Sequence, residues 1–393
     1  MKMHEARRRI EETGQINAFI SLTEETEGDT VIAVKDLLDV RGAVTTGGGK
    51  ILTKRPALKD AKAVALARAA GCGVVGKTNL YEWAYGVSSD NPHYGVVRNP
   101  RDPSRSAGGS SSGSAAAVAS GACDWAIGTD TAGSIRIPAS LCGVVGFKPT
   151  NGTISVAGVI PLSRSMDAVG ALAPDVSTAA RAADIMSGGA LSARPSPAKL
   201  RFRIGVPKGW VSGGLDEETA AVWSAVSAGL RPVPFPDRKE MFRLAEVIQQ
   251  WEAMEFHRRW FEAYPESYSP PVHQRLAAAG KISRSEYVAA CRDRVRLRQE
   301  VARAMADVDA VLLPTTACVA PKLETAEQIR EPMVRFTRPF NLTGQPVFSI
   351  PAPVEGLPVG IQIIGRHGDD SRLAAVALAK EKAWARRAAE GRA

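Results

Sequence analysis

Hydrophobic residues follow two patterns that alternate along the chain. Short apolar runs, typical of buried strands, occupy residues 72–75, 125–130, 143–150, 309–314 and 359–365. Apolar positions at helical spacing occupy residues 57–70, 113–120, 174–187, 216–229, 239–262 and 283–307, and the last twenty residues. Strands that alternate with helices predict an α/β fold, with a central mixed β-sheet covered by helices on both faces.

Local signals refine this pattern. The segment TNLYEWA, which starts at residue 78, is predicted to begin a helix capped by Thr78 or Asn79. Ser112 and Ser114 are predicted as cap residues of the next helix. Residues 86–112 are rich in Ser, Asn, Pro and Gly and are predicted to form a long ordered loop. Loops of that length inside a compact domain are usually functional.

At 393 residues the chain is long enough for one large domain, which we expect to span residues 1–393. Within it we expect a catalytic core at 30–190, a helical covering region at 238–340, and a returning strand with a C-terminal helix at 341–393. At 188–237 Pro and Gly are frequent and the pattern fades, which predicts a surface excursion or a junction between subdomains.

Composition narrows the chemistry. The five cysteines lack C-x-x-C spacing and the five histidines form no pair at helical spacing, so we expect no metal and no cofactor. A catalytic apparatus would then use hydroxyls, amines or carboxylates. No apolar window of about 18 residues exists, and the charged start lacks a signal-peptide run, so we expect a cytoplasmic protein without a membrane span. The mild net charge of +9 does not favour a nucleic-acid partner.

Two literal motif matches are better explained in other ways. Residues 71–78, GCGVVGKT, fit the phosphate-binding loop pattern, but valines lie where the loop should be and predict a strand. Residues 109–113, GSSSG, fit the nucleophile turn of α/β-hydrolases, with Ser111 as nucleophile. That turn must follow a buried strand, whereas the preceding NPRDPSRSAG is predicted to be loop. An esterase that uses Ser111 stays open as an alternative, with a base among His257, His273 and His367.

A third match is much longer. The run from 107 to 150 contains GGSS at 108–111 and GTDTAGSIRIP at 128–138. With these motifs the chain resembles the amidase signature family, whose lysine-bearing strand is matched by VIAVKD at 31–36. The resemblance implies the amidase signature fold and hydrolysis of an amide C–N bond. Since it covers most of the chain, a chance match is very improbable; further matching segments lie at 76–79, 98–100, 341–346 and 356–360.

The resemblance also implies catalytic roles for three residues. Ser134 is expected to be the nucleophile, Ser110 to relay its proton, and Lys35 to be the base, with a cis peptide bond between Gly109 and Ser110. A lysine has a free pKa of about 10.4 and acts as a base near neutral pH only when burial disfavours its charge. Lys35 ends an apolar run that begins at Val31, which is consistent with a buried amine.

The residues around Ser134 are expected to support the reaction. Asp130 and Arg136 are expected to form a charged scaffold, and Ser111 to orient Lys35 or Ser110. The family usually has glycine where this chain has Ala132, so a positive φ there would strain the alanine. The backbone amides of an oxyanion hole are expected from Thr131, Ala132, Gly133 and Ser134.

Several functions stay open on the sequence alone. We expect a stand-alone hydrolase that releases ammonia or an amine from a small carboxamide. The alternatives are a glutaminase subunit of a tRNA-dependent amidotransferase and, less favoured, a non-catalytic binding module. A homodimer is a further open question, because only 34 residues precede Lys35, fewer than the family usually has. The acyl pocket is expected from residues 80–95, Thr315–Pro321 and Phe336–Asn341, with Trp83, Tyr85, Tyr94, Phe336 and Arg338 as candidate contacts.

Overall fold

The computed structural model describes residues 1–52, 54–191 and 202–389. A mixed sheet of eleven strands runs through the molecule in the order β1-β3-β2-β6-β8-β7-β12-β13-β11-β9-β10. A separate pair, β4 and β5, lies in the long loop. The strands are β1 (Phe19–Leu22), β2 (Thr30–Lys35), β3 (Cys72–Thr78), β4 (Arg98–Asn99), β5 (Asp102–Ser106), β6 (Trp125–Asp130), β7 (Val145–Lys148), β8 (Ala168–Ala173), β9 (Ile204–Pro207), β10 (Arg231–Val233), β11 (Ala310–Pro314), β12 (Val347–Pro351) and β13 (Gly360–Gly365).

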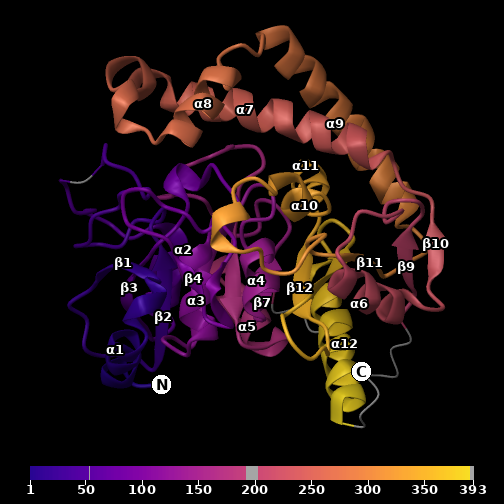
Figure 1. Cartoon of the computed structure of the whole chain (residues 1–393), viewed down its shortest axis with the longest axis horizontal. Coiled ribbons are helices and arrows are strands. Elements are labelled where there is room, and N and C mark those ends of the chain that lie inside the picture. Colours follow the sequence, from indigo (N-terminus) through magenta and orange to yellow (C-terminus); the bar gives the residue numbers. More distant parts are fainter. Residues whose placement is uncertain (53, 192–201, 390–393) are drawn as a thin grey trace.

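Helices cover both faces of this sheet. The helices α2, α5 and α12 pack side by side, α3 packs against α4, and α7 packs against α8, α9 and α11. In Figure 1, α7, α8 and α9 form an outer layer above α10 and α11, while α1 lies on the opposite side. The helices are α1 (Met3–Glu12), α2 (Lys62–Ala69), α3 (Ser112–Ala119), α4 (Arg136–Cys142), α5 (Val176–Ser187), α6 (Glu217–Ser227), α7 (Arg238–Ala263), α8 (Pro270–Ala279), α9 (Arg284–Ala304), α10 (Arg330–Val334), α11 (Pro339–Thr343) and α12 (Asp370–Ala389).

The strand β2 shows how the sheet divides the core. Its side chains alternate between faces, as in any strand: Ile32 and Val34 join the large core under α2, α5 and α12. Val31 and Ala33 join the core that includes the alanines of α3. By the same alternation Lys35, the last residue of β2, faces the side of α3 and α4. The predicted α/β fold with a mixed sheet and two helical layers is confirmed.

The predicted helix after Thr78 is wrong. The chain instead makes a single 3-10 turn, η2 (Glu82–Ala84), in which Trp83 and Ala84 adopt positive φ angles of 52° and 57°. Trp83 packs against the rings of His257 and Trp260 at 5.1 and 5.7 Å. A buried aromatic side chain therefore fixes this turn against α7, and the local helix signal is overridden.

The prediction that Ser112 and Ser114 cap α3 is also wrong. The residue at the cap position is Ser111, and it makes no side-chain cap hydrogen bond. The Ser114 hydroxyl instead donates to the carbonyl of Ile127 at 3.1 Å and contacts Thr78 Oγ1 at 2.7 Å. It ties α3 to two strands of the sheet. The cap predicted at Asp216 is present, because its carboxylate accepts the amide of Thr219 at 2.9 Å.

The segment 188–237 differs from the expected surface excursion wherever it is described; residues 192–201 lie outside the described part of the chain. Its β9 and β10 extend the main sheet, in parallel with β11, and β10 forms the outer edge. The prolines at 232 and 234 lack an N–H group, and prolines discourage pairing of an edge strand with a further strand.

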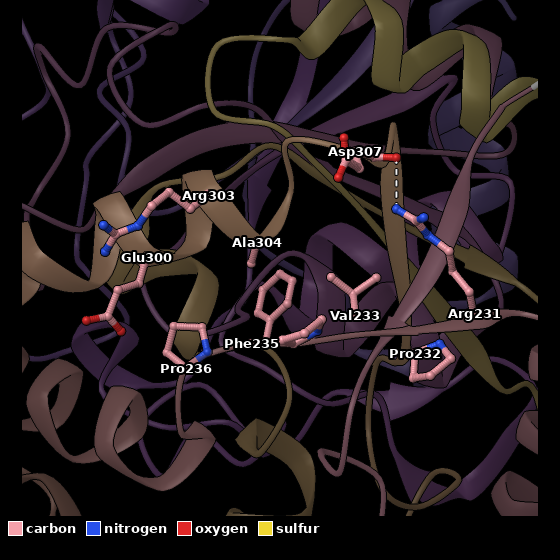
Figure 2. Close-up of a pocket in the computed structure, with 10 residues that line it drawn as sticks. Arg231, Pro232, Val233, Phe235, Pro236, Glu300, Arg303, Ala304 and Asp307 are labelled. Carbon is pink, nitrogen blue, oxygen red and sulfur yellow. Dashed lines mark hydrogen bonds between the residues drawn. The ribbon is translucent and has the colours of Figure 1, made fainter.

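Figure 2 shows a cavity of about 580 Å³ at this edge, between β10 and the end of α9. Phe235 and Val233 form its apolar part, and Arg231 donates to the carbonyl of Asp307 at 3.0 Å. None of the predicted catalytic residues lines it. Among the helices of the described residues, none combines the length and apolar character that crossing a membrane would require.

Candidate active site

Parallel pairing brings the predicted base to the predicted oxyanion loop. The strands β2 and β6 run parallel, with Val34 opposite Ile127, so their carboxyl ends meet at the same edge of the sheet. Lys35 ends one strand, and Asp130 ends the other and begins the loop to Ser134. Residues that lie almost 100 positions apart in the sequence thus share one edge of the sheet.

The Lys35 amine is buried among three hydroxyl groups. Its side chain has no solvent exposure, and Nζ lies 2.7 Å from Ser110 Oγ, 2.9 Å from Ser111 Oγ and 2.9 Å from Thr129 Oγ1. Burial lowers the pKa of this amine to about 7, although the charges of Asp130 and Asp167 act in the opposite direction. A neutral amine has one lone pair, so one of the three hydroxyls must then donate to Nζ. The environment therefore suits a base near neutral pH.

The loop that carries Ser110 is held from both sides. The Gly109–Ser110 peptide bond is cis, and a Cβ at position 109 would lie 2.1 Å from the carbonyl oxygen of Ser88, so only glycine fits. The Ser110 carbonyl accepts the amide of Tyr81 at 3.2 Å. Backbone contacts with the segment 81–88 therefore fix the position of the Ser110 hydroxyl.

Ser134 lies beside this group and is joined to it through the backbone. Its carbonyl accepts the amide of Ser111 at 3.2 Å, and the residue is 3% exposed. Within the described residues the Ser134 hydroxyl makes no hydrogen bond. The structure thus brings Lys35, Ser110 and Ser111 into direct side-chain contact and leaves the hydroxyl of Ser134 uncommitted next to them.

One of the four expected oxyanion donors is used elsewhere. The amide of Gly133 donates to Asp130 Oδ1 at 2.9 Å, so the expected role for this amide is corrected. The amides of Thr131, Ala132 and Ser134 make no hydrogen bond with other described residues. These three amides are the ones that can face a carbonyl oxygen.

The expected strain at Ala132 is also corrected, because the positive φ lies one residue later. Gly133 has φ of 124°, and Ala132 is outside the left-handed region. A Cβ at position 133 would lie 2.3 Å from Thr337 Oγ1, whose hydroxyl donates to the Ala132 carbonyl at 2.6 Å. Glycine is therefore required at 133, while alanine is tolerated at 132.

Asp130 and Arg136 form a buried ion pair under this loop. Arg136 Nη2 and Nε lie 2.8 and 3.0 Å from the two carboxylate oxygens, and neither side chain is exposed. Burial alone would raise the pKa of the Asp130 carboxyl, but the guanidinium charge and its hydrogen bonds hold that pKa well below its usual range. The remaining Arg136 donors reach Thr337 O at 3.0 Å, Gln362 Oε1 at 2.7 Å and Asn341 Oδ1 at 2.6 Å.

We expect Arg136→Met to destabilise the fold by about 3–5 kcal/mol, because it leaves the Asp130 carboxylate buried and unpaired. Urea unfolding monitored by circular dichroism measures this change. The exposed Arg284 on α9, changed to methionine, is the matched control and should shift stability by less than about 0.5 kcal/mol. Equal stability of Arg136→Met and wild type would contradict a structural role for the pair.

The sequence analysis missed several residues of this site. Thr129 contacts Lys35; it lies inside the GTD motif, so its position was available, but its role was not. Asn341 donates to Asp130 Oδ1 at 2.8 Å and comes from a far segment. Asp167 accepts the Thr131 hydroxyl at 2.5 Å, and burial raises the pKa of its carboxyl to about 7. No local pattern distinguished Asn341 or Asp167, because their partners are defined only by the fold.

The esterase alternative loses its support here. Ser111 does not follow a strand, and its hydroxyl donates to the Thr129 carbonyl at 3.2 Å while it contacts Lys35. In the described structure none of the five histidines hydrogen-bonds to Ser110, Ser111 or Ser134; His257, for example, pairs with Tyr268 OH at 3.0 Å. A histidine-free centre made of two serines and a neutral lysine defines the class: a serine hydrolase with a lysine base.

Comparison with known proteins agrees with this class. The Amidase family model matches residues 30–374. A subunit of the glutamyl-tRNA(Gln) amidotransferase of Koribacter versatilis is 34% identical over 445 residues, which span 95% of this chain and 92% of that protein. AtzE, the 1-carboxybiuret hydrolase subunit of Pseudomonas sp., is 36% identical over 86% of this chain and 80% of its own length.

A crystal structure of an amidase superposes with a TM-score of 0.90 and 34% identity, over 97% of this chain and 95% of that one. The chain therefore belongs to the amidase family, which is the amidase signature family that its motifs resemble. It is an enzyme that hydrolyses amide C–N bonds.

Proposed function

We propose that this amidase hydrolyses a small carboxamide through an acyl-enzyme on Ser134, with Ser110 as proton relay and Lys35 as base. One observation carries the proposal: a fully buried amine with a pKa of about 7 lies 2.7 Å from the hydroxyl of Ser110. The amide next in the chain, that of Ser111, holds the backbone of Ser134. A lysine in this state can accept a proton that a surface lysine could not.

The cycle uses the relay twice. Ser134 Oγ attacks the amide carbon, its proton passes to Ser110, and the Ser110 proton passes to Lys35 Nζ. The amides of Thr131, Ala132 and Ser134 donate to the oxyanion that forms. Return of the proton through Ser110 to the leaving nitrogen breaks the C–N bond and releases ammonia or an amine. Water then attacks the ester by the same route, and a carboxylic acid leaves.

A second candidate is a glutaminase subunit of a larger complex. It is favoured by the 34% identity to the amidotransferase subunit over 95% of this chain. The relative AtzE is also one subunit of its enzyme. The chemistry at Ser134 would be unchanged in that case, and a partner chain would use the released ammonia. A homodimer and a cytoplasmic location also belong to this proposal, and the free thiols of Cys72, Cys123 and Cys142 suit a reducing compartment.

Ammonia release from a panel of primary amides and from glutamine, measured with the isolated chain, tests the proposal. We expect turnover of at least one simple amide without any partner, and a serine-directed fluorophosphonate label on the peptide that contains Ser134. Turnover of glutamine alone, and only after a partner chain is added, would favour the second candidate. Labelling of Ser111 instead would contradict the assignment of the nucleophile.

A further inference from the structure

A second group of buried polar side chains lies under α7, and the cycle above does not use it. It consists of Tyr85, Arg330 and Arg338, and we call it the arginine cluster. Tyr85 is 2% exposed and Arg338 1%. Within the described residues, the Tyr85 hydroxyl and the Nε atoms of both arginines are buried and have no hydrogen-bond partner. Buried polar groups are normally satisfied, so these atoms indicate a missing ligand.

The charges of the cluster and its surroundings do not balance. Arg338 pairs with Glu246 at 3.1 Å and lies over the Phe242 ring at 4.4 Å. The neighbouring Arg275 pairs with Glu327. The guanidinium of Arg330, in contrast, makes no hydrogen bond or ion pair with any described residue. One cation is therefore buried without a counter-ion, an arrangement that costs several kcal/mol unless an anion binds.

The electrostatics place these groups close together. Burial lowers the pKa of Arg330 to about 10, and the charges of Arg338 and Arg275 act in the same direction. Burial raises the pKa of Tyr85 to about 12, while the charges of Arg330, Arg338 and Arg275 oppose that rise. The phenol is thus a neutral donor beside two guanidinium groups. Arginine forks and a phenol suit the two oxygens of a carboxylate.

The cluster adjoins the proposed reaction centre through both of its segments. Thr337, next to Arg338, donates to the carbonyl of Ala132 in the oxyanion loop. Ser88, three residues after Tyr85, lies against Gly109. Val87, Val334 and Ile137 share one hydrophobic cluster beside α4, which follows Ser134. In Figure 1, α10 and α11 lie directly beneath α7.

We propose that the arginine cluster binds a carboxylate on the acyl part of the substrate, so that the enzyme prefers monoamides of dicarboxylic acids over neutral amides. The proposal rests on the function proposed above. The sequence had offered Arg338 as one candidate for a carboxylate; the structure adds Arg330 and Tyr85, and makes Arg330 the uncompensated charge.

Paired substrates test it. Malonamate and succinamate carry a carboxylate, and isovaleramide and isocaproamide replace that group by an isopropyl group of similar shape. For wild type we expect kcat/KM for the better acid to exceed that of its neutral counterpart by about 10²-fold or more, the usual size of a buried charge contact. In Arg330→Gln this ratio should fall by about 10²-fold, and in Tyr85→Phe by about 10-fold. The exposed Arg292 on α9, changed to glutamine, should leave the ratio unaltered.

Binding without turnover gives a second measurement. In Ser134→Ala, millimolar succinamate should raise the melting temperature, and Arg330→Gln in the same background should abolish the shift. A wild-type enzyme that hydrolyses isocaproamide as well as succinamate would overturn the carboxylate site and leave the serine mechanism intact. Hydrolysis of both amides by Ser134→Ala would instead overturn the mechanism. If Arg330→Gln does not fold, the Tyr85→Phe ratio decides the matter, and an unchanged ratio counts against the site.

Discussion

Replacing Ser134 by alanine is expected to lower kcat/KM for every amide by at least about 10⁴-fold, because loss of the nucleophile removes the acyl-enzyme route. The residual rate would come from the amides of Thr131 and Ala132 and from binding. Steady-state ammonia release under saturating and limiting substrate measures the change. Mass spectrometry adds a second readout, since wild type mixed rapidly with a slow amide should gain the acyl mass on the peptide with Ser134, and the variant should not.

The matched control for this variant is Ser112→Ala. Ser112 is buried in the same loop, and its only contact is a weak hydrogen bond of 3.5 Å to the Asn79 carbonyl. It should retain hydrolysis within about 10-fold of wild type, since a neutral hydrogen bond contributes only about 1 kcal/mol. If Ser134→Ala keeps a rate similar to that of Ser112→Ala, the nucleophile is another residue.

The second large effect is expected at Lys35. Lys35→Met removes the base and should lower kcat by about 10²- to 10⁴-fold, the usual contribution of a general base. In wild type, kcat/KM should rise tenfold per pH unit below pH 7 and level off above it, because the amine has a pKa of about 7 and only its neutral form accepts a proton. A profile of kcat/KM between pH 5 and 9 measures this.

Asp167 titrates in the same range, because burial raises its pKa to about 7, so it needs its own control. The Asp167 charge raises the pKa of Lys35. Asp167→Asn should therefore keep the rising profile and move its midpoint to lower pH. Loss of the rise in Asp167→Asn, with the rise still present in a partly active Lys35 variant, would assign the titration to Asp167 and refute a lysine base.

Stability provides an independent measurement of the same amine. Its pKa is about 7 in the folded protein and 10.5 as the ordinary value, so between these values the unfolded chain binds more protons. Wild type should then gain stability relative to Lys35→Met as pH rises through this window, by up to about 1.4 kcal/mol per pH unit. Below pH 7 both states carry the proton, and the difference should no longer change.

The sequence predicted most of the fold, because long amphipathic helices and apolar runs carry strong periodicity. The helices α5, α6, α7 and α9 begin and end within a few residues of their predicted bounds. Two central strands were missed. The strand β8 consists of small residues, AVGALA, and β12 is a run of five between prolines, so neither has a clear strand pattern. Their identity as strands comes from pairing with β6, β7 and β13.

The sequence by itself determined the chemical groups: two serine motifs, a lysine at the end of an apolar run, and the glycines that permit close packing around them. Local patterns suffice for this because motifs and periodicity are properties of neighbouring residues. Only the tertiary structure decided that Lys35 is neutral near pH 7, that the Gly133 amide belongs to Asp130, and that Arg330 lacks a counter-ion. Burial and charge pairing depend on residues from distant segments, and no short stretch of sequence contains both partners.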